Sequence, residues 1–444
     1  MKERAIVAIS TPLGSGGIAI IRLSGEDSLK IARGLFFNEE NLYKPDPRKL
    51  YLGEFRYGYV TEKCLLVYFK APYSFTGEDV VEFQIHGGEL LAKKVLEACI
   101  ERGATLAEPG EFSKRAFLNG KISLDEAEGI TDIIHASSEA ELRAGLSRAK
   151  GILYKRSCEY QDIIKEVLAG IDVSFDYPEN DDEQTTKEDM LKKVKVIRTE
   201  IDEIVEKNKN SKYIRTGISV AIAGKPNVGK SSLLNSLLGE DRAIVTEIAG
   251  TTRDSLVETV LYKGIKFNFI DTAGIRDSKD VVENIGIKKS KEALRESDVV
   301  LVLLDATSKL SDEDKEILEL TKNKRRIIVI NKTDRKRVLE KMDNELSISA
   351  KTGKNTEELL KSIHDMVLGE NLDQSASLIL NERVLEILKG ISILLNEILK
   401  DKKNTLDLLE TKLKKVYTEL GKISGKTENE DIIDLIFSKF CLGK

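Results

Sequence analysis

Short apolar runs alternate with helical stretches between residues 217 and about 368, and this alternation limits the possible folds more than any other feature of the chain. The apolar runs are "ISVAIAG", "KFNFIDTAG", "VVLVLLDA" and "RIIVINKTD". Strands that alternate with helices are typical of a parallel sheet whose strands are connected by crossover helices. The sequence therefore predicts an α/β domain over residues 217–368.

The positions of proline indicate where long helices are permitted outside this domain. All seven prolines lie between Pro12 and Pro226, and none lies between Pro109 and Pro178. Residues 1–118 contain short runs rich in Val, Ile and Phe, punctuated by Gly or Pro, which predict strands and turns. Residues 119–216 and 369–444 are rich in Lys, Glu and Leu at helical spacing, which predicts helices.

Two apolar stripes in the last segment predict a pair of antiparallel helices. Their members repeat at intervals of three and four residues: Val384, Leu388, Ile391, Leu395 and Ile398, then Leu406, Leu409, Leu413, Val416 and Leu420. An isolated hairpin of about 70 residues buries little apolar surface. We therefore expect one helical domain whose sequence is interrupted by the α/β domain, rather than two unrelated helical modules.

The composition supports a multidomain globular protein and excludes several other classes. Among the 444 residues, 41% are hydrophobic and 33% are charged, and the net charge of -5 argues against a broadly basic nucleic-acid binder. A local basic patch is compatible with that average. The four cysteines have no metal-binding spacing, and nowhere do about 18 apolar residues run together. We expect a reduced, cytoplasmic protein that does not span a membrane.

The stretch "GKPNVGKS", Gly224 to Ser231, follows a predicted strand and opens a predicted helix, as a phosphate-binding P-loop requires. Glycines let backbone amides approach the phosphates, Lys230 supplies a positive charge, and the Ser231 hydroxyl can bind Mg²⁺. "DTAG" places Asp271 at a strand end, where it can reach the metal through water. A Gly-rich turn without function is the alternative reading.

Two further motifs predict that the nucleotide is GTP. "NKTD", Asn331 to Asp334, ends a strand, and a carboxylate there can accept two hydrogen bonds from guanine but not from adenine. "SAK", Ser349 to Lys351, can offer a backbone amide to the guanine carbonyl. "TEIAGTTRD", Thr246 to Asp254, is placed to close over the γ-phosphate, with Thr252 as the second hydroxyl on Mg²⁺. Taken alone, that last stretch reads equally as a surface loop.

The residue that orients the attacking water is not evident in "DTAGIRDSKDVVE". Ras-like enzymes have a glutamine directly after the glycine, whereas this chain has Ile275, which has no polar atom to hold water. Polar candidates follow further along the same segment: Arg276, Asp277, Asp280 and Glu283. Glu283 also precedes a predicted helix, where an acidic residue favours the N-terminus in any case.

An arginine within an apolar run suggests a second site in the N-terminal segment. Arg22 lies in "IAIIRL", where an unpaired buried charge would be costly, so it requires a partner or an anionic ligand. In "DVVEFQIHGG" the strand alternation places Glu82 on a polar face opposite Val81 and Phe83. An internal ion pair between Arg22 and Glu82 is the simplest explanation from the residues alone.

The motifs together resemble the MnmE (TrmE) family of tRNA-modification GTPases. The resemblance extends from Ser10 to Lys444 and includes "SFTGEDVVEFQIHGG", "PGEFSKRAFLNGK" and the terminal "CLGK", besides the GTPase motifs. It implies α/β plus α architecture: a Ras-like P-loop G domain inserted into a helical domain and preceded by an α+β folate-binding domain. The implied domains are residues 1–118, 119–216, 217–368 and 369–444.

The resemblance also implies a function. Members hydrolyse GTP with Mg²⁺ and K⁺, form homodimers, and work with a flavin- and NADH-using partner of the MnmG/GidA type in a heterotetramer or larger assembly. With a tetrahydrofolate derivative (5,10-methylene- or 5-formyl-tetrahydrofolate), they install an aminomethyl-type group, such as carboxymethylaminomethyl, on C5 of the wobble uridine of certain tRNAs. A ribosome-assembly GTPase switch is the alternative, although no appended RNA-binding module is legible in the sequence.

Site residues follow by matching positions to the family motifs. The potassium ligands would be Asn227, Thr246, Ile248 and Thr251, the Mg²⁺ ligands Ser231 and Thr252, and the folate contacts Arg22, Glu82, Lys121 and Lys444. Glu283 matches the family's catalytic glutamate, and Cys441 would be needed for modification. The alternative for Asn227 is a residue that only forms a turn. The alternative for Cys441 is a thiol without function in a disordered tail. The predicted GTP contacts are Asn227, Val228, Gly229, Lys230, Ser231, Ser232, Thr246, Glu247, Ile248, Ala249, Gly250, Thr251, Thr252, Asp271, Thr272, Ala273, Gly274, Asn331, Lys332, Asp334, Ser349, Ala350 and Lys351.

Overall fold

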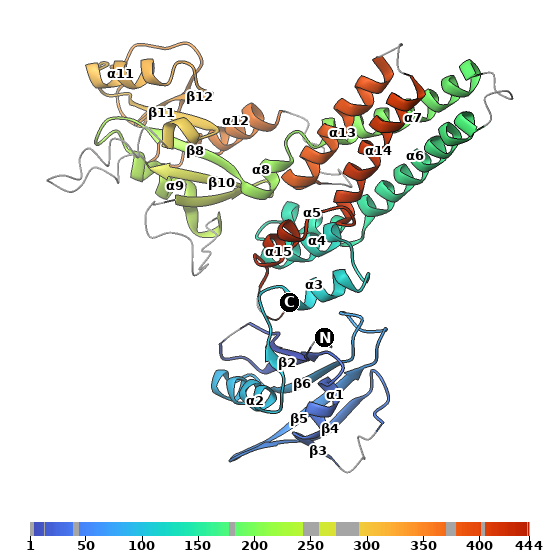
Figure 1. The fold of residues 1–444 in the computed structure, drawn as a ribbon. Coiled ribbons are helices and arrows are strands. Elements are labelled where there is room, and N and C mark those ends of the chain that lie inside the picture. The colour runs from blue at the N-terminus through green and yellow to red at the C-terminus, as the bar shows by residue number, and fades with distance from the viewer. Residues whose placement is uncertain are drawn as a thin grey trace, which may run out of the picture. The chain divides into compact units, whose positions relative to one another are not determined.

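The computed structural model describes residues 4–12, 14–38, 44–176, 183–242, 257–271, 293–369, 379–400, 405–441 and 443 (Figure 1). The chain forms two compact units. The first comprises Met1–His135, Gly145–Glu203 and Glu386–Lys444, and the second comprises Ala136–Ala144 and Ile204–Leu385. None of the helices within the described ranges is long and apolar enough to cross a membrane.

The N-terminal part of the first unit is built on a seven-stranded sheet of order β3-β4-β5-β6-β2-β1-β7. Its strands are β1 (Ile6–Ile9), β2 (Ile18–Ser24), β3 (Phe36–Phe37), β4 (Leu50–Tyr57), β5 (Val60–Phe69), β6 (Val80–His86) and β7 (Thr105–Leu106). Neighbouring strands are antiparallel except β1 and β7. The prediction of strands and turns missed three helices here: α1 (Ser28–Arg33), α2 (Glu89–Glu101) and α3 (Glu111–Leu118). Helix α2 was missed because its buried residues are mostly small, namely Ala92, Val95, Ala98 and Cys99.

The alternation predicted for β6 is confirmed. Val81, Phe83 and Ile85 are buried in the main core of this sheet, whereas Glu82 and Gln84 are only partly buried. The ring of Phe83 meets the ring of Phe55 edge to face at a centroid distance of 5.6 Å. One face of the sheet is therefore apolar, and the opposite face carries the polar row.

The helical part of the first unit draws on both ends of the chain. It contains α4 (Leu124–His135), α6 (Ile152–Asp176), α14 (Leu406–Ser424) and α15 (Glu430–Phe437), with portions of α5 (Glu139–Ala149), α7 (Glu183–Lys207) and α13 (Glu382–Lys400). The predicted apolar stripes on α13 and α14 are buried. Helix α14 packs most closely on α6. That contact joins segments on either side of the α/β domain.

The second unit contains a six-stranded sheet of order β13-β12-β11-β8-β10-β9. The strands are β8 (Ile218–Ala223), β9 (Val257–Tyr262), β10 (Ile265–Asp271), β11 (Val299–Asp305), β12 (Arg326–Asn331) and β13 (Glu345–Ser347). All neighbours are parallel, as predicted, except β9, which runs antiparallel to β10. The helices are α8 (Ser211–Thr216), α9 (Lys230–Arg242), α11 (Asp312–Leu320) and α12 (Thr356–Leu368).

Both faces of this sheet are buried. On β11, Leu301 and Leu303 pack with α9 and α12, while Val300 and Val302 belong to the cluster with Ile317 of α11. A parallel sheet covered on both faces carries its functional groups at the carboxyl ends of its strands. The predicted architecture, an α/β P-loop domain inserted into a helical domain and preceded by an α+β domain, is confirmed.

Candidate functional site

The P-loop joins β8 to α9 and wraps around the ammonium group of Lys230. The Lys230 Nζ donates hydrogen bonds to the carbonyl oxygens of Gly224 and Lys225 at 2.6 and 3.0 Å. Gly229 has a φ of +103°, and a Cβ at this position would lie 2.3 Å from Asn331 Nδ2. Only glycine fits there, because the loop passes directly beside Asn331 at the end of β12.

Asn331 connects the P-loop to the segment "SAK". Its Nδ2 donates to the carbonyl oxygen of Val228 at 2.9 Å, and its Oδ1 accepts from the Ala350 amide at 2.9 Å. The residue is buried, with an exposed fraction of 2%. A buried side chain that satisfies two backbone groups holds both segments in a fixed geometry. In the structure the Ala350 N–H is engaged by this hydrogen bond.

Lys332 makes a second connection between the motifs. Its Nζ donates to the carbonyl oxygen of Asn227 at 2.8 Å and to Asp305 Oδ2 at 2.6 Å. Burial opposes ionisation of Asp305, but hydrogen bonds from Lys332 and Thr307 outweigh it and lower the pKa of this carboxyl. Asn227 itself has a φ of +62°, which agrees with the turn-forming reading, and the residue is exposed.

Asp334 is oriented by the Ser349 hydroxyl, which donates to its Oδ1 at 2.7 Å. This hydrogen bond is the main reason that the pKa of Asp334 is lowered. The parallel pairing of β12 with β13 brings the segments after these strands to the same edge of the sheet. An ionised carboxylate therefore stands beside the P-loop network, ready to accept hydrogen bonds.

The structure brings together the predicted GTP contacts of three motifs: Asn227, Val228, Gly229, Lys230, Ser231, Ser232, Asn331, Lys332, Asp334, Ser349, Ala350 and Lys351. Asp271 is the last residue of β10. The other predictions lie outside the described residues: Thr246, Glu247, Ile248, Ala249, Gly250, Thr251, Thr252, Thr272, Ala273, Gly274, Glu283 and Lys444.

Two carboxylates that support the P-loop were not predicted from the sequence. Asp305 partners Lys332, and Asp314 Oδ2 accepts from Lys225 Nζ at 2.7 Å. Asp314 is also part of the capping box that starts α11 with Ser311. Asp305 ends a buried strand next to β8, and that position was an available signal. Asp314 was hidden, since an acidic residue in a first helical turn has an ordinary explanation.

In the first unit, Arg22 and Glu82 form the ion pair that the residues alone suggested. They lie opposite each other on β2 and β6, and Arg22 Nε is 2.7 Å from Glu82 Oε1. Arg22 Cζ also lies 5.8 Å from the centroid of the Phe112 ring. The ion pair uses only Nε, and among the described residues neither Nη group of Arg22 has a hydrogen-bond partner. These groups remain available to an anion.

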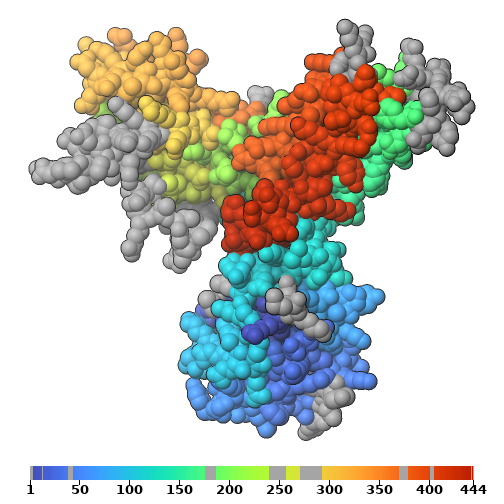
Figure 2. Space-filling view, viewed as in Figure 1, coloured from blue at the N-terminus to red at the C-terminus, as the bar shows by residue number. Residues whose placement is uncertain are grey.

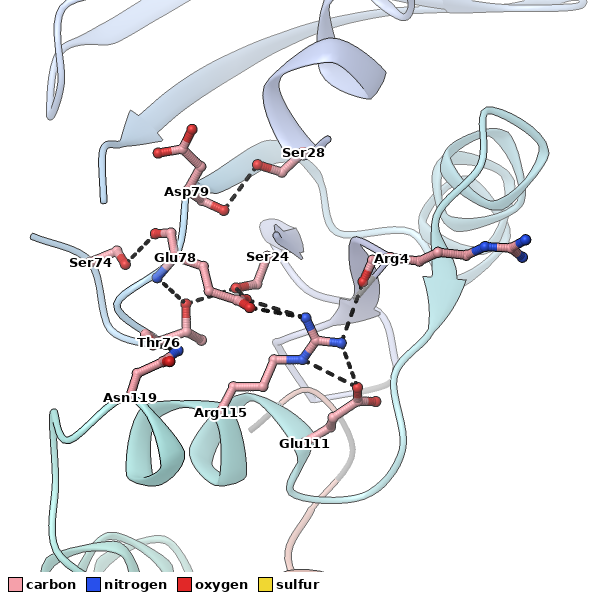
Figure 3. A network of polar contacts seen from close by, with 10 residues as sticks. All are labelled: Arg4, Ser24, Ser28, Ser74, Thr76, Glu78, Asp79, Glu111, Arg115 and Asn119. Atoms are coloured by element: carbon pink, nitrogen blue, oxygen red, sulfur yellow. Dashed lines mark hydrogen bonds and ion pairs between the residues drawn. The ribbon is translucent and has the colours of Figure 1, made fainter. Parts of the chain in front are cut away.

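A buried network joins the motif "SFTGED" to the motif "PGEFSKRAF" (Figure 3). Arg115 of α3 donates to both carboxylate oxygens of Glu78 at 3.2 and 3.3 Å and to Glu111 Oε1 at 2.8 Å. Ser24 Oγ donates to Glu78 Oε2 at 2.6 Å, and Asn119 Nδ2 donates to the carbonyl oxygen of Thr76. The loop before β6 is therefore fixed to the C-terminal end of α3, where Arg115 lies in the last turn and Asn119 follows the helix.

Lys121 lies beside this loop, since a Cβ on Gly77 would come within 3.1 Å of Lys121 Cε. The chain's C-terminal residues reach the same domain. The Gly110 amide donates to the carbonyl oxygen of Cys441 at 3.3 Å, and Ser10 Oγ donates to that of Gly443 at 3.2 Å. The described residues of the tail are thus held by contacts to Gly110 and Ser10, which disfavours the alternative of a disordered tail.

The fold and the network at the strand ends define a P-loop nucleotide-binding protein, and comparison with known proteins refines this class. A family model described as "MnmE helical domain" matches residues 124–441, and one described as "GTP-binding protein TrmE N-terminus" matches residues 5–121. Relatives of this chain include proteins with the name "tRNA modification GTPase MnmE". That of Clostridioides difficile is 41% identical over 100% of this chain and 99% of its own length, and that of Lactobacillus gasseri is 39% identical over 99% and 98%.

The chain therefore belongs to the MnmE family of tRNA-modification GTPases, and the resemblance stated from the sequence is confirmed. A solved structure of Aquifex aeolicus Era is 30% identical and covers 42% of this chain and 68% of that chain. Its TM-score of 0.28 is too low to support an argument.

Proposed function

We propose that the second unit binds GTP at the P-loop and hydrolyses it to GDP and phosphate. The observation that carries this proposal is the Asn331 bridge between Val228 and Ala350, because it unites the phosphate-binding and base-binding motifs in one rigid network. Asp334 would accept two hydrogen bonds from guanine. The amide of Lys351 would face the guanine carbonyl, since the Ala350 amide is engaged by Asn331.

The residues present fit the proposed cations. Ser231 is exposed in the first turn of α9, where a hydroxyl can bind Mg²⁺ beside the phosphates, and Thr252 would supply the second hydroxyl. Asn227 has its carbonyl held by Lys332 and its side chain exposed, which suits a K⁺ ligand together with Thr246, Ile248 and Thr251. A cation at this point stabilises the charge that develops in the transition state.

For the first unit we propose a site for a tetrahydrofolate derivative, formed by Arg22, Glu82, Lys121 and Lys444. The support is a half-buried guanidinium whose two Nη groups face no partner among the described residues. A folate carries carboxylates that such a group binds well. The cofactor would be 5,10-methylene- or 5-formyl-tetrahydrofolate, and the partner a flavin- and NADH-using protein of the MnmG/GidA type. Together with this partner, and with Cys441 required, the chain would install an aminomethyl-type group on C5 of the wobble uridine in cytoplasmic tRNA.

We further propose that the chain is a homodimer that pairs through residues 1–118. Exposed apolar side chains on β4 support this, since Leu50 and Leu52 are 54% and 70% exposed. Pairing of two copies would remove these side chains from water. Sedimentation of the full chain tests it. A monomer at micromolar concentration contradicts the proposal.

The modification itself is tested with the full chain, its flavoprotein partner, unmodified tRNA, GTP, K⁺, NADH, 5,10-methylene-tetrahydrofolate and either glycine or ammonium. Mass spectrometry of the tRNA nucleosides should reveal a modified wobble uridine. Arg22→Ala should abolish it, whereas Arg56→Ala, at an exposed ion pair with Glu54, should not. Unmodified tRNA in an assay where GTP is hydrolysed normally would overturn the folate-linked proposal.

A further inference from the structure

Two side chains that lie 306 residues apart in sequence meet at the end of the chain. Cys441 Sγ is 3.4 Å from His135 Nε2, within hydrogen-bond distance for sulfur. Cys441 is partly buried and His135 is exposed. A thiol that contacts an imidazole has a base at hand to accept its proton, which is the arrangement that activates nucleophilic cysteines.

The Cys441 side of this pair is held by its backbone. The carbonyl oxygen of Cys441 accepts from the Gly110 amide, and that of Gly443 accepts from Ser10 Oγ. Gly443 has a φ of +83°, and a Cβ there would lie 2.4 Å from the Ile9 carbonyl oxygen. The tail is therefore in close contact with the end of β1, and a larger residue at Gly443 would displace it.

Apolar packing fixes the tail on the helix that carries His135. Phe437 and Phe440 form a buried cluster with Leu124 and Ala127 of α4, and the two phenyl rings are 5.0 Å apart between centroids. Figure 2 shows the dark red C-terminal segment against the cyan segment of the chain. The relative position of Cys441 and α4 is consequently set by a core, and not by the hydrogen bond alone.

Helix α4 is itself held by a buried arginine. The arginine is Arg148 of α5, 1% exposed, and its guanidinium contacts Asp125 at 2.9 Å, Glu128 at 2.8 Å and Asp132 at 2.5 Å. The three acids and His135 follow one another at intervals of three, four and three residues, so all four lie on one face of α4. The ionic cluster ends one turn before the imidazole and fixes the direction of that face.

His135 is in the last turn of α4, and the C-terminal end of a helix favours a positive side chain. Asp132 lies one turn earlier on the same face. On the elements that pack against the tail, Lys114 of α3 is paired with Asp434 of α15 at 2.7 Å.

The remaining cysteines provide a contrast. Burial raises the pKa of Cys64 and of Cys99 to about 12, so both thiols stay protonated. Cys158 is partly buried in α6. Among the described residues, Cys441 is the cysteine whose thiol contacts a histidine side chain.

We infer that His135 is the positioning residue and proton acceptor for Cys441, and this inference rests on the proposed function, in which Cys441 is required for tRNA modification. In the step itself the Sγ–H bond breaks and an Nε2–H bond forms, so that a neutral pair becomes a thiolate and an imidazolium with no change in net charge.

The test measures the thiol directly and needs no GTP, folate or tRNA. In full-length protein carrying Cys158→Ser, the rate of Cys441 alkylation by iodoacetamide is followed at neutral pH by intact mass spectrometry. His135→Gln should slow alkylation by about tenfold or more, because the thiolate fraction falls, and should reduce the ultraviolet absorbance of the thiolate. His135→Asn should behave in the same way. His86→Gln, at an exposed histidine on β6, is the matched control and should leave the rate unchanged.

An alkylation rate that is equal in wild type and in both His135 variants would overturn the inference, even if tRNA modification still required Cys441. Slower alkylation in both variants, together with tRNA modification that survives Cys441→Ser, would support the pair and refute the role of Cys441 in the proposed function. Failure of the inferred Cys441–His135 pair can therefore be distinguished from failure of the proposed role of Cys441 in tRNA modification.

Discussion

The nucleotide site of the second unit and the side-chain pairs of Cys441 and Arg22 in the first unit are assembled in opposite ways. In the nucleotide site, short contiguous motifs leave the ends of neighbouring parallel strands, and side chains such as Asn331 bind the backbone of the next motif. In the first unit, the thiol of Cys441 contacts the imidazole of His135, and Arg22 forms an ion pair with Glu82 across two strands. Each motif of the nucleotide site is local in sequence, and its geometry is that of the backbone. The arrangement in the first unit depends on pairs of side chains that only tertiary packing brings together.

The largest expected effect separates the two sites completely. Cys441→Ser should abolish tRNA modification, because a hydroxyl is not a nucleophile at neutral pH without strong activation. GTP hydrolysis should stay within about twofold of wild type, since Cys441 belongs to the first unit and the P-loop to the second. Both activities are measured on one preparation of the enzyme. A parallel loss of both would contradict the separation and indicate a folding defect.

The second effect concerns the support of α4 and measures stability. Arg148→Met leaves three carboxylates without their buried cation, and breaking such a cluster should reduce the free energy of unfolding by about 3–5 kcal/mol. The matched control is Arg156→Met on α6, whose side chain is 53% exposed, and it should cost less than about 1 kcal/mol. Thermal and urea unfolding provide the comparison. Equal losses in the two variants would show that the cluster does not hold α4.

The third effect tests the nucleotide site at a residue outside the described ranges. Glu283→Ala should slow GTP hydrolysis by on the order of 10²-fold or more. The reason is that Ile275 offers no group to orient the attacking water. Glu283 would orient it through a second water in the closed dimer. The affinities for GTP and GDP should stay nearly unchanged. Single-turnover hydrolysis in potassium is the measurement. A rate within about threefold of wild type, in protein that binds GTP normally, would leave Glu283 as a residue that favours a helix start.

The smallest expected effect concerns the cation. Replacing sodium by potassium at equal ionic strength should raise the rate of GTP hydrolysis by about tenfold, and Asn227→Ala should remove that difference. Asn227 is suitable for this test because Lys332 holds its backbone carbonyl, so the P-loop keeps one anchor after the side chain is removed. Equal rates in the two salts for the wild-type protein would refute the potassium assignment and leave Asn227 as a turn-forming residue.

Several features of the fold could be predicted because they repeat along the chain. The parallel strands of the second unit, the alternation on β6 and the buried stripes on α13 and α14 follow from the spacing of apolar residues. Helix α2 and the antiparallel edge strand β9 were not predicted. Small residues form the buried face of α2, and strand direction depends on the partner that a strand finds.

By itself, the sequence determined the P-loop, the guanine motif, the split helical segments and the family, because each rests on residue types at short fixed spacings. Only the tertiary structure decided which helix α14 packs against, that Asp305 pairs with Lys332 and Asp314 with Lys225, and that His135 contacts Cys441. The physical reason is that such contacts form between side chains far apart along the chain. Their positions are set by how whole elements pack, and no local pattern of residues records that packing.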